Sequence, residues 1–159
     1  RESVAMANNG VYRKKELDSA PLAYTSNNWI RGSGEIADFV KIKPHLKDRC
    51  SFAQMNLMEI KQKMTGKKFD LIFCRNVFIY FSPEQIKAVT TDLMNCLHPH
   101  GFLFLGTSET LSGLELPLQS KGLSIYAMPG QAEPSTGKPA AAASAPVFEL
   151  PPVLKVLCV

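Results

Sequence analysis

The sequence predicts an α/β fold with a parallel sheet, and three stretches in the middle of the chain indicate it. Residues 69–73 are mostly apolar with no turn signal, as in a strand that is buried on both faces. Residues 82–85, Ser-Pro-Glu-Gln, offer a capping residue, a proline suited to the first helical position and a glutamine that can close a capping box. The helix expected over 83–97 leads to a second apolar run at 102–105. Strand, helix and strand in this order are typical of α/β folds.

Length and composition favour one ordinary globular domain. The chain has 159 residues, of which 45% are apolar, and no apolar run approaches the length of a membrane span. No charged-then-apolar leader of the secretory kind is visible. The four cysteines lie far apart among apolar neighbours, which predicts buried, reduced thiols and a cytoplasmic protein.

Basic residues are concentrated in the first half of the chain. Residues 1–75 hold 14 Lys or Arg against 8 Asp or Glu, a net charge of +6, while the whole chain has +4. A basic half could favour an acidic partner, and it could equally be an ordinary solvated surface. No aromatic residues interleave with the basic ones, so a nucleic-acid partner is not expected.

Before the central strand, the sequence predicts a helix end and a small antiparallel sheet. Residues 2–9 are predicted to form the last turns of a helix that ends at Gly10. A short helix is possible at 14–18. Three short candidate strands follow, at 29–31, 39–43 and 50–57. The glycines within residues 32–34 turn the first of these strands into the second.

Residues 32–37, Gly-Ser-Gly-Glu-Ile-Ala, also fit a dinucleotide-binding fingerprint. That fingerprint needs a buried strand before it and a helix after it. A strand-like alternation follows instead, so we do not expect a phosphate-binding loop here.

The elements on either side of the central strand are less regular. Residues 58–68 form a basic loop or a short helix, 98–101 a turn, 107–109 a possible helix start and 123–128 a final strand. The helix over 83–97 carries an apolar stripe, which predicts core positions at Ile86, Val89, Leu93 and Leu97. His45, His98 and His100 lack an acid or thiol that would complete a zinc spacing, so no metal is expected.

Polar and reactive side chains stand where the central strand ends. Cys74, Arg75 and Asn76 follow the apolar run directly, just ahead of the helix cap at Ser82. In an open α/β sheet the carboxyl ends of the strands line the ligand crevice. The sequence therefore predicts a ligand site at this strand end.

The same residues carry a family resemblance. The string Cys-Arg-Asn-Val-Phe-Ile-Tyr-Phe at 74–81, a helix, and then Leu-His-Pro-His-Gly-Phe-Leu-Phe-Leu-Gly-Thr-Ser-Glu at 97–109 resemble the chemotaxis receptor methyltransferases, the CheR family. The resemblance covers about residues 1–128. It implies transfer of a methyl group from S-adenosylmethionine to glutamate side chains of chemoreceptors in bacterial chemotaxis-type signalling. It also implies a partial S-adenosylmethionine-dependent methyltransferase (Rossmann-like) fold over 1–129, with a small antiparallel β-subdomain inserted at about 27–55.

The resemblance assigns roles to five residues. Asn56 and Leu57 would line the adenine side of the cofactor, and Arg75 and Asn76 would help to hold it. Tyr80 would be catalytic, because its hydroxyl could aim the incoming carboxylate at the methyl group. Without the resemblance, Asn56 is an ordinary turn residue, Leu57 a core residue and Tyr80 a core aromatic with a bonded hydroxyl.

The implied partner is the cytoplasmic domain of a chemoreceptor, with no nucleic acid and no direct membrane insertion. Some family members dock a short peptide from the receptor's C-terminus on the β-subdomain. Addition of a strand to an exposed sheet edge is a physical route for such docking, and a plain surface hairpin is the alternative.

The resemblance also predicts that the chain is a fragment. In the family, a glycine-containing cofactor loop and an acidic ribose ligand lie upstream of the part that matches here. Two further family strands flank the strand at 69–74, so we expect its edge to be exposed and the piece alone to be inactive. A non-catalytic receptor- or nucleotide-binding signalling module is the alternative function.

The last part of the chain has a different composition. Residues 130–152 are rich in Ala and Pro, with no large apolar residue from 130 to 146, which is typical of a linker. Residues 153–159 then predict a strand that resembles the first strand of a response-regulator receiver domain. A chance apolar tail is the alternative.

Overall fold

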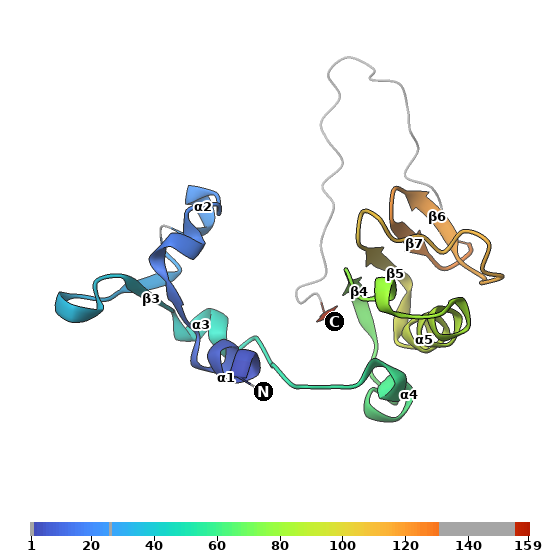
Figure 1. Ribbon diagram of the computed structural model, residues 1–159, viewed down its shortest axis with the longest axis horizontal. Helices are drawn as coiled ribbons and strands as arrows, with labels where there is room; N and C mark the ends of the chain where they lie inside the picture. The colour runs from blue at the N-terminus through green and yellow to red at the C-terminus, as the bar shows by residue number, and fades with distance from the viewer. Residues whose placement is uncertain (1, 26, 131–154) are drawn as a thin grey trace, which may run out of the picture. The chain divides into compact units, whose positions relative to one another are not determined.

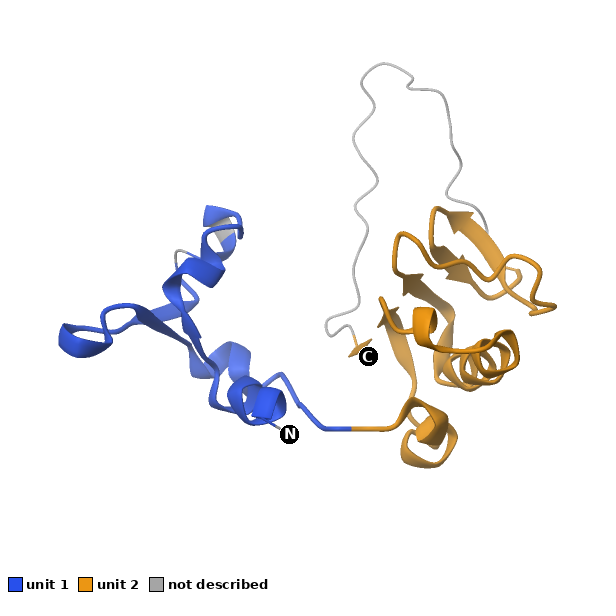
Figure 2. Ribbon diagram, in the orientation of Figure 1, with its two compact units in different colours: residues 1–54 blue, residues 55–159 orange. Residues whose placement is uncertain are grey.

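The computed structural model describes residues 2–25, 27–130 and 155–159. These divide into two units, one within residues 1–54 and one within residues 55–159 (Figure 2). Among the described helices, none combines the length and the apolarity that crossing a bilayer requires.

The first unit is built on a three-stranded antiparallel sheet with the order β1-β3-β2. Its strands are β1 (Val11–Arg13), β2 (Trp29–Arg31) and β3 (Phe39–Ile42), so two of the three predicted strands are confirmed. The third prediction, a strand at 50–57, is wrong, because 50–56 make no strand pairing. The stretch at 11–13, for which no strand was predicted, supplies the third strand instead.

The turn at Gly10 explains why β1 forms. The helix α1 (Glu2–Asn9) ends there, as predicted: Gly10 has φ 67° and its N–H donates to the carbonyl of Met6 at 2.9 Å. The carbonyl of Gly10 in turn accepts from the N–H of Ile42 at 2.9 Å, which brings the chain beside β3. The pairing of β1 with β3 therefore begins at the contact between Gly10 and Ile42, which are far apart in the sequence, and no local pattern predicts it.

The glycine-rich stretch after β2 closes a hairpin. The N–H of Gly32 donates to the carbonyl of Phe39 at 2.9 Å, and a Cβ at Gly32 would lie 1.9 Å from the carbonyl oxygen of Ile36. The short helix η2 (Gly34–Ile36) lies in this turn, and β2 and β3 are antiparallel neighbours. The other short helices of the unit are η1 (Lys14–Leu17), α2 (Leu22–Thr25) and α3 (Pro44–Lys47).

The second unit contains a five-stranded mixed sheet with the order β6-β7-β5-β4-β8 (Figure 1). Its strands are β4 (Phe69–Cys74), β5 (Leu97–Leu105), β6 (Gln119–Gly122), β7 (Ile125–Ala127) and β8 (Val156–Cys158). The strand β4 is parallel to β5 and β8, whereas β7 is antiparallel to β5 and β6. The strands predicted at 69–74, 102–105 and 123–128 are thus present in β4, β5 and β7.

The predicted turn at 98–101 is wrong, because these residues lie inside β5. Pairing of Phe69 with Leu97 starts the strand early, and a register shift between Phe69 and Leu71 absorbs the extra residues. A cross-strand partner therefore overrides the local turn signal of Pro and Gly.

The helix α5 (Pro83–Asn95) follows the predicted signals closely. The side chain of Ser82 accepts from the N–H of Gln85, and the Gln85 side chain accepts from the N–H of Ser82, which completes the capping box. The helix buries Val89 and Leu93 as expected. It contacts η3 (Leu57–Glu59) and α4 (Ile60–Lys63), and residues of α4 and α5 share a core cluster with residues of β4 and β5.

One face of β4 is covered more fully than the other. Ile72 and Cys74 are 0% exposed and share a core cluster with Ile60, Val89 and Leu93 from the helices. Leu71 and Phe73, on the opposite face, remain partly exposed. The prediction of a strand buried on both faces is therefore right for one face only, because α4 and α5 pack on one side.

The strand predicted at 153–159 is observed as β8, and it pairs with β4 on the edge away from β5. The expectation that this edge of β4 is exposed is therefore wrong over Leu71–Phe73. A receiver-domain origin of 153–159 stays a prediction. The linker predicted at 130–152 lies almost entirely outside the described residues.

The cysteines differ in exposure. Cys74 and Cys96 are buried as predicted, but Cys50 and Cys158 are exposed, and all four are free thiols. The prediction of burial fails for the last two because one lies in the unpaired stretch after α3 and the other on an edge strand.

Replacement of Ser82 by alanine should destabilise the second unit. The variant loses the side-chain cap of α5, which should lower the free energy of unfolding by about 1 kcal/mol. Urea unfolding followed by circular dichroism measures the change. Ser51→Ala is the control, because Ser51 is exposed and precedes no helix. Equal losses in the two variants would contradict a role for the cap.

Candidate functional site

A single buried carboxylate binds the ends of both central parallel strands. The side chain of Glu109, only 6% exposed, accepts four backbone N–H groups. Its Oε2 accepts from Asn76 at 2.9 Å and Gly106 at 2.6 Å, and its Oε1 accepts from Val77 and Phe78 at 2.8 Å each. The segment after β4 is thereby joined to the end of β5.

The backbone after β4 is shaped to receive an anion. Asn76 has φ 60°, a left-handed conformation that asparagine tolerates better than most residues. This conformation lets the N–H groups of three successive residues converge, as in the anion-binding backbone concavities of other proteins. Here the chain supplies the anion itself, through Glu109.

The surroundings of Glu109 keep it ionised. Burial alone would raise the pKa of this carboxyl group, but the four backbone hydrogen bonds outweigh burial and hold the pKa below its ordinary value. Burial, reinforced by the charge of Glu109, raises the pKa of Cys74 to about 12. The Cys74 thiol therefore stays protonated and is no nucleophile at neutral pH.

Gly106 makes room for this arrangement. A Cβ there would lie 2.6 Å from Oε2 of Glu109 and 2.7 Å from Oδ1 of Asn76. The predicted helix start at 107–109 is wrong, because these residues form a turn that no helix follows. The N–H of Glu109 donates to the carbonyl of Gly106 at 3.0 Å in this turn. Sequence reasoning missed Glu109, although its place just after a second buried strand was an available signal.

Three of the predicted site residues lie together on the segment that Glu109 holds. Arg75, Asn76 and Tyr80 are exposed, and Tyr80, at the end of η4 (Phe78–Tyr80), is 80% exposed. The alternative of Tyr80 as a core aromatic is therefore wrong, and Phe78, 4% exposed, fills the core instead. The roles of the three exposed side chains stay predictions.

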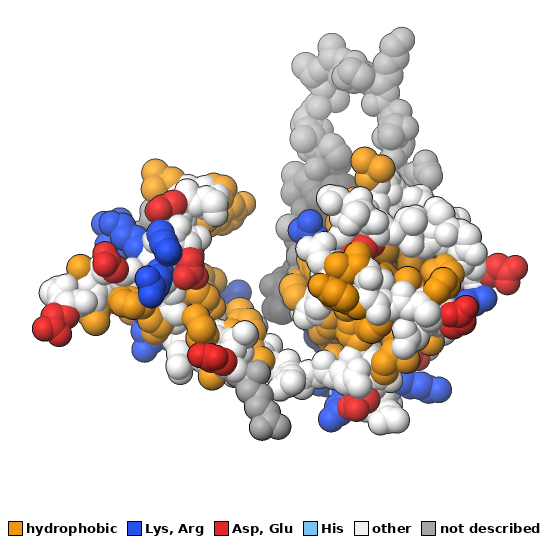
Figure 3. All heavy atoms as spheres, in the orientation of Figure 1, with side chains coloured by type: hydrophobic (Ala, Val, Ile, Leu, Met, Phe, Trp, Pro, Cys, Tyr) orange, Lys and Arg blue, Asp and Glu red, His pale blue; other side chains and the backbone are white. Residues whose placement is uncertain are grey.

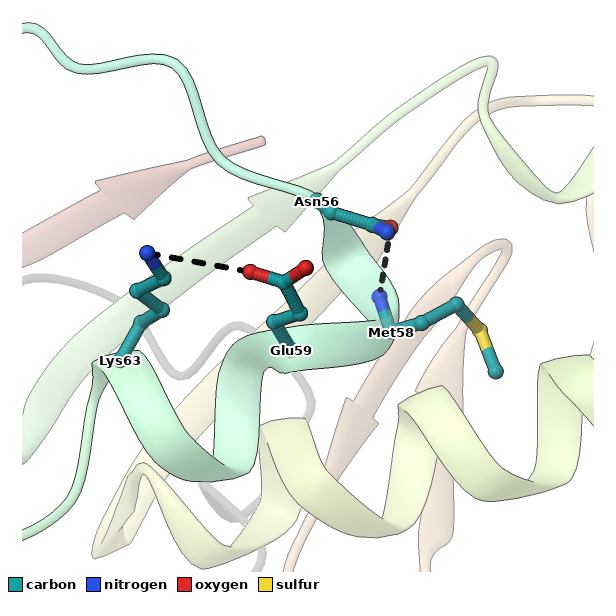
Figure 4. A network of polar contacts seen from close by, with 4 residues as sticks. All are labelled: Asn56, Met58, Glu59 and Lys63. Atoms are coloured by element: carbon teal, nitrogen blue, oxygen red, sulfur yellow. Dashed lines mark hydrogen bonds and ion pairs between the residues drawn. The ribbon is translucent and has the colours of Figure 1, made fainter.

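Asn56 and Leu57 also belong to the second unit, but they lie on a different segment, at the start of η3. In Figure 4 the side chain of Asn56 caps η3, and its Oδ1 accepts from the N–H of Met58 at 3.1 Å. Leu57 packs partly buried against the core cluster. Within the described residues, no hydrogen bond joins Asn56 or Leu57 to the segment 75–80. These contacts agree with the structural roles that were the alternative, and the adenine-lining roles stay predictions.

The exposed donors fit part of a polar cofactor site. Within the described residues the guanidinium of Arg75 makes no ion pair, so it can receive an anionic group such as a cofactor carboxylate. The side chains of Asn76 and Tyr80 offer an amide and a hydroxyl nearby in the chain. The described residues contain no group of three His, Cys, Asp or Glu that could hold a metal ion.

Polar side chains exposed just after a parallel strand of an α/β sheet are typical of the ligand sites of Rossmann-like domains. The family model described as CheR methyltransferase, SAM binding domain, matches residues 1–126. The chain belongs to this CheR family, and S-adenosylmethionine is the cofactor of the domain that it matches.

Curated relatives agree with the family match. The chemotaxis protein methyltransferase of Escherichia coli (strain K12) is 34% identical over 127 residues, which are 80% of this chain and 44% of the relative. That of Salmonella typhimurium (strain LT2) is 32% identical over the same shares. That of Vibrio anguillarum is 48% identical over 75 residues, 47% of this chain and 26% of the relative. The chain thus spans less than half the length of these relatives.

Replacement of Glu109 by glutamine should destabilise the second unit at neutral pH. The amide loses the charge, and its NH₂ group would face backbone donors, so we expect a loss of about 1–3 kcal/mol in the free energy of unfolding. Chemical unfolding monitored by circular dichroism measures it. Glu115→Gln is the matched control, because the side chain of Glu115 is 95% exposed.

The difference between wild type and Glu109→Gln should depend on pH. The folded-state pKa of Glu109 lies below its ordinary value of 4.5, so its stabilisation is complete above that value. It is lost as the pH falls through the folded-state pKa. The two proteins should therefore converge in stability in acid, and a difference that stays constant down to pH 2 would contradict the assignment.

Proposed function

We propose that the protein transfers a methyl group from S-adenosylmethionine to glutamate side chains in the cytoplasmic domain of a chemoreceptor. The observation that carries the proposal is the segment 75–80, which Glu109 fixes at the end of β4 so that Arg75, Asn76 and Tyr80 are exposed together. Membership of the CheR family and the names of the relatives support the same reaction. We place the protein in the cytoplasm, where such a receptor domain is accessible.

Methyl transfer to a carboxylate requires little of the protein beyond alignment of the two reactants. S-adenosylmethionine, when bound, supplies an activated methyl group and becomes S-adenosylhomocysteine. A substrate glutamate is already ionised near neutral pH, so no general base is needed. What remains is to hold the carboxylate in line with the methyl group and to exclude water.

Each exposed residue then has one task. Arg75 attracts the anionic end of the cofactor, and the Asn76 amide donates to it or accepts from it. The Tyr80 hydroxyl donates to the incoming carboxylate and aims it. The amide oxygen of Asn56 serves the cap of η3, and its amide nitrogen would meet the adenine edge.

The first unit is the candidate docking surface for the receptor. The strand β3 is central in its sheet, so β1 and β2 each have an outer edge to which a receptor strand could add. The charge of this unit does not show where a receptor would dock, because Arg13, Lys14 and Lys15 line a hollow together with Asp18 and Asp38. Figure 3 shows basic and acidic side chains mixed on this unit.

The Tyr80→Phe variant should lower turnover far more than cofactor affinity. Loss of one positioning hydroxyl should cost about tenfold or more in rate. Initial methylation rates and dissociation constants for S-adenosylhomocysteine are compared between the wild type and the variant, each made as the full-length protein to which this chain belongs. Tyr24→Phe is the control, because Tyr24 is also exposed but lies in the first unit. Unchanged turnover in Tyr80→Phe would remove Tyr80 from the mechanism.

Residues 1–159 made alone should bind S-adenosylmethionine weakly and methylate no receptor. Asn56, Leu57, Arg75 and Asn76 supply only part of a pocket, and in the resemblance a glycine-bearing loop and an acidic ribose ligand complete it. Calorimetry and a radiolabelled methyl-transfer assay on receptor test this expectation. Micromolar binding with turnover would show that our assignment of the site is wrong. Tight binding without turnover would favour a non-catalytic binding module.

A further inference from the structure

Two side chains at the start of β7 bond the loop that carries Glu109. The hydroxyl of Ser124 donates to the carbonyl of Glu109 at 3.4 Å. The hydroxyl of Tyr126 accepts from the N–H of Leu111 at 3.0 Å and lies 3.3 Å from Oγ1 of Thr110. Residues 109–111, which belong to no helix or strand, are thereby held to β7.

The hydroxyl groups of this loop form one directed chain of hydrogen bonds. Oγ1 of Thr110 donates to Oγ of Ser112 at 3.0 Å, so its single hydrogen is not available to Tyr126. The hydroxyl hydrogen of Tyr126 is therefore left to donate to Thr110, while its oxygen accepts from Leu111. A phenylalanine at position 126 would fill the same space and make neither bond.

Tyr126 is itself firmly held. The strand β7 lies between β5 and β6 (Figure 1), and Tyr126 pairs with Leu103 on one side and with Ser120 on the other. The residue is 8% exposed and belongs to the core cluster of the second unit. Because a close-packed ring cannot turn away without opening the core, its hydroxyl gives the loop a fixed point.

The backbone conformation also converges on Glu109. Within the described residues, the residues other than glycine with positive φ are Asn76, at 60°, and Ser124, at 59°. The N–H of Asn76 donates to the carboxylate of Glu109, and the hydroxyl of Ser124 donates to its carbonyl. This conformation is costly for a residue with a side chain and persists only where surrounding contacts fix it. The carbonyl of Ser124 is fixed by the N–H of Leu105, which donates to it at 2.8 Å.

A series of contacts thus leads from β7 to the exposed segment 75–80. Tyr126 and Ser124 fix the loop at 109–111, and the carboxylate of Glu109 fixes the N–H groups of residues 76–78. The four hydrogen bonds to this carboxylate are between 2.6 and 2.9 Å long. A small displacement of the loop would lengthen them and weaken the hold on the segment.

We propose that Tyr126, assisted by Ser124, is a positioning residue whose hydroxyl fixes the loop that places the carboxylate of Glu109 and, through it, the segment 75–80. Tyr126 acts through Glu109 and not on a substrate, because its side chain is buried and its hydroxyl bonds the loop. The effect of Tyr126 on turnover rests on the proposed function, whereas its effect on Glu109 does not.

The titration of the Glu109 carboxyl group is the first test, followed by ¹³C NMR on the full-length protein to which this chain belongs. Burial would raise the pKa of Glu109, and its backbone hydrogen bonds hold the pKa below its ordinary value. Tyr126→Phe should weaken these bonds and raise the pKa toward that ordinary value. An unchanged pKa in a folded Tyr126→Phe protein would overturn the proposal, because a merely structural hydroxyl would affect stability alone.

Ser120→Ala is the matched control for this titration. It also removes one hydroxyl group from the hairpin of β6 and β7, but the hydrogen bond of Ser120 stays within the hairpin, where it donates to the carbonyl of Gly122 at 3.0 Å. The pKa of Glu109 should therefore be the same as in the unmodified protein. An equal rise in Ser120→Ala and Tyr126→Phe would overturn the proposal.

Two further measurements decide the case if Tyr126→Phe fails to fold. Ser124→Ala removes the other bond to the loop and should also raise the pKa of Glu109, and an unchanged value would overturn the role of Ser124. In the unmodified protein, the N–H of Leu111 should exchange slowly with solvent, since it donates to a buried hydroxyl. Exchange at the rate of an exposed amide would overturn the role of Tyr126.

A double-substitution cycle connects the loop to turnover. In the full-length protein, Tyr126→Phe should lower kcat about threefold or more, because the hydroxyl of Tyr80 loses its alignment. In a Tyr80→Phe background the same substitution should cost much less, since the hydroxyl that it positions is already absent. Equal losses in both backgrounds would overturn positioning through Tyr80. Absence of turnover in the unmodified protein would contradict the proposed function instead, and the titration of Glu109 would still decide the role of Tyr126.

Discussion

The carboxylate of Glu109 satisfies the N–H groups of three successive residues after β4 and one residue after β5. Without a charged acceptor, backbone donors at this depth would remain unpaired, and each buried unpaired donor costs about 1–3 kcal/mol. The left-handed backbone of Asn76 and the missing side chain of Gly106 are both needed for the carboxylate to fit. The fixed segment 75–80, on which the proposed function rests, follows from this one ion.

Because the N–H groups of Asn76, Val77 and Phe78 already donate to Glu109, these three backbone donors are not available to a ligand. Phe78 is buried and anchors the segment in the core, so that its neighbours Ile79 and Tyr80 are exposed. An internal anion thus fills the concavity that a bound phosphate would fill in other α/β proteins. The side chains that the segment exposes include a guanidinium, an amide and a hydroxyl.

The sheet of the second unit is supported unevenly. Helices cover the face that carries Ile72 and Cys74, whereas the face with Phe73 keeps partial exposure and a ring stack with Phe104 at a centroid distance of 4.7 Å. Among the described residues, the outer edge of β4 pairs only with β8. Support for β4 on that edge therefore depends on a strand distant in sequence, while the site at its end depends on Glu109.

Local signals in the sequence determined much of the fold. The capping box at Ser82 and Gln85, the stop at Gly10 and the apolar run of β4 each act within a few residues, so pattern and propensity suffice to predict them. Polar side chains at Arg75 and Asn76 after the buried strand were likewise predicted and are exposed, whereas Cys74 of the same prediction is buried. Only the tertiary structure decided the third strand of the first sheet, the inclusion of 98–101 in β5, the pairing of β8 and the role of Glu109. Each of these depends on a partner far away in the chain, as with Asn76 and Glu109, which are 33 positions apart, and such a contact leaves no periodic pattern in the sequence.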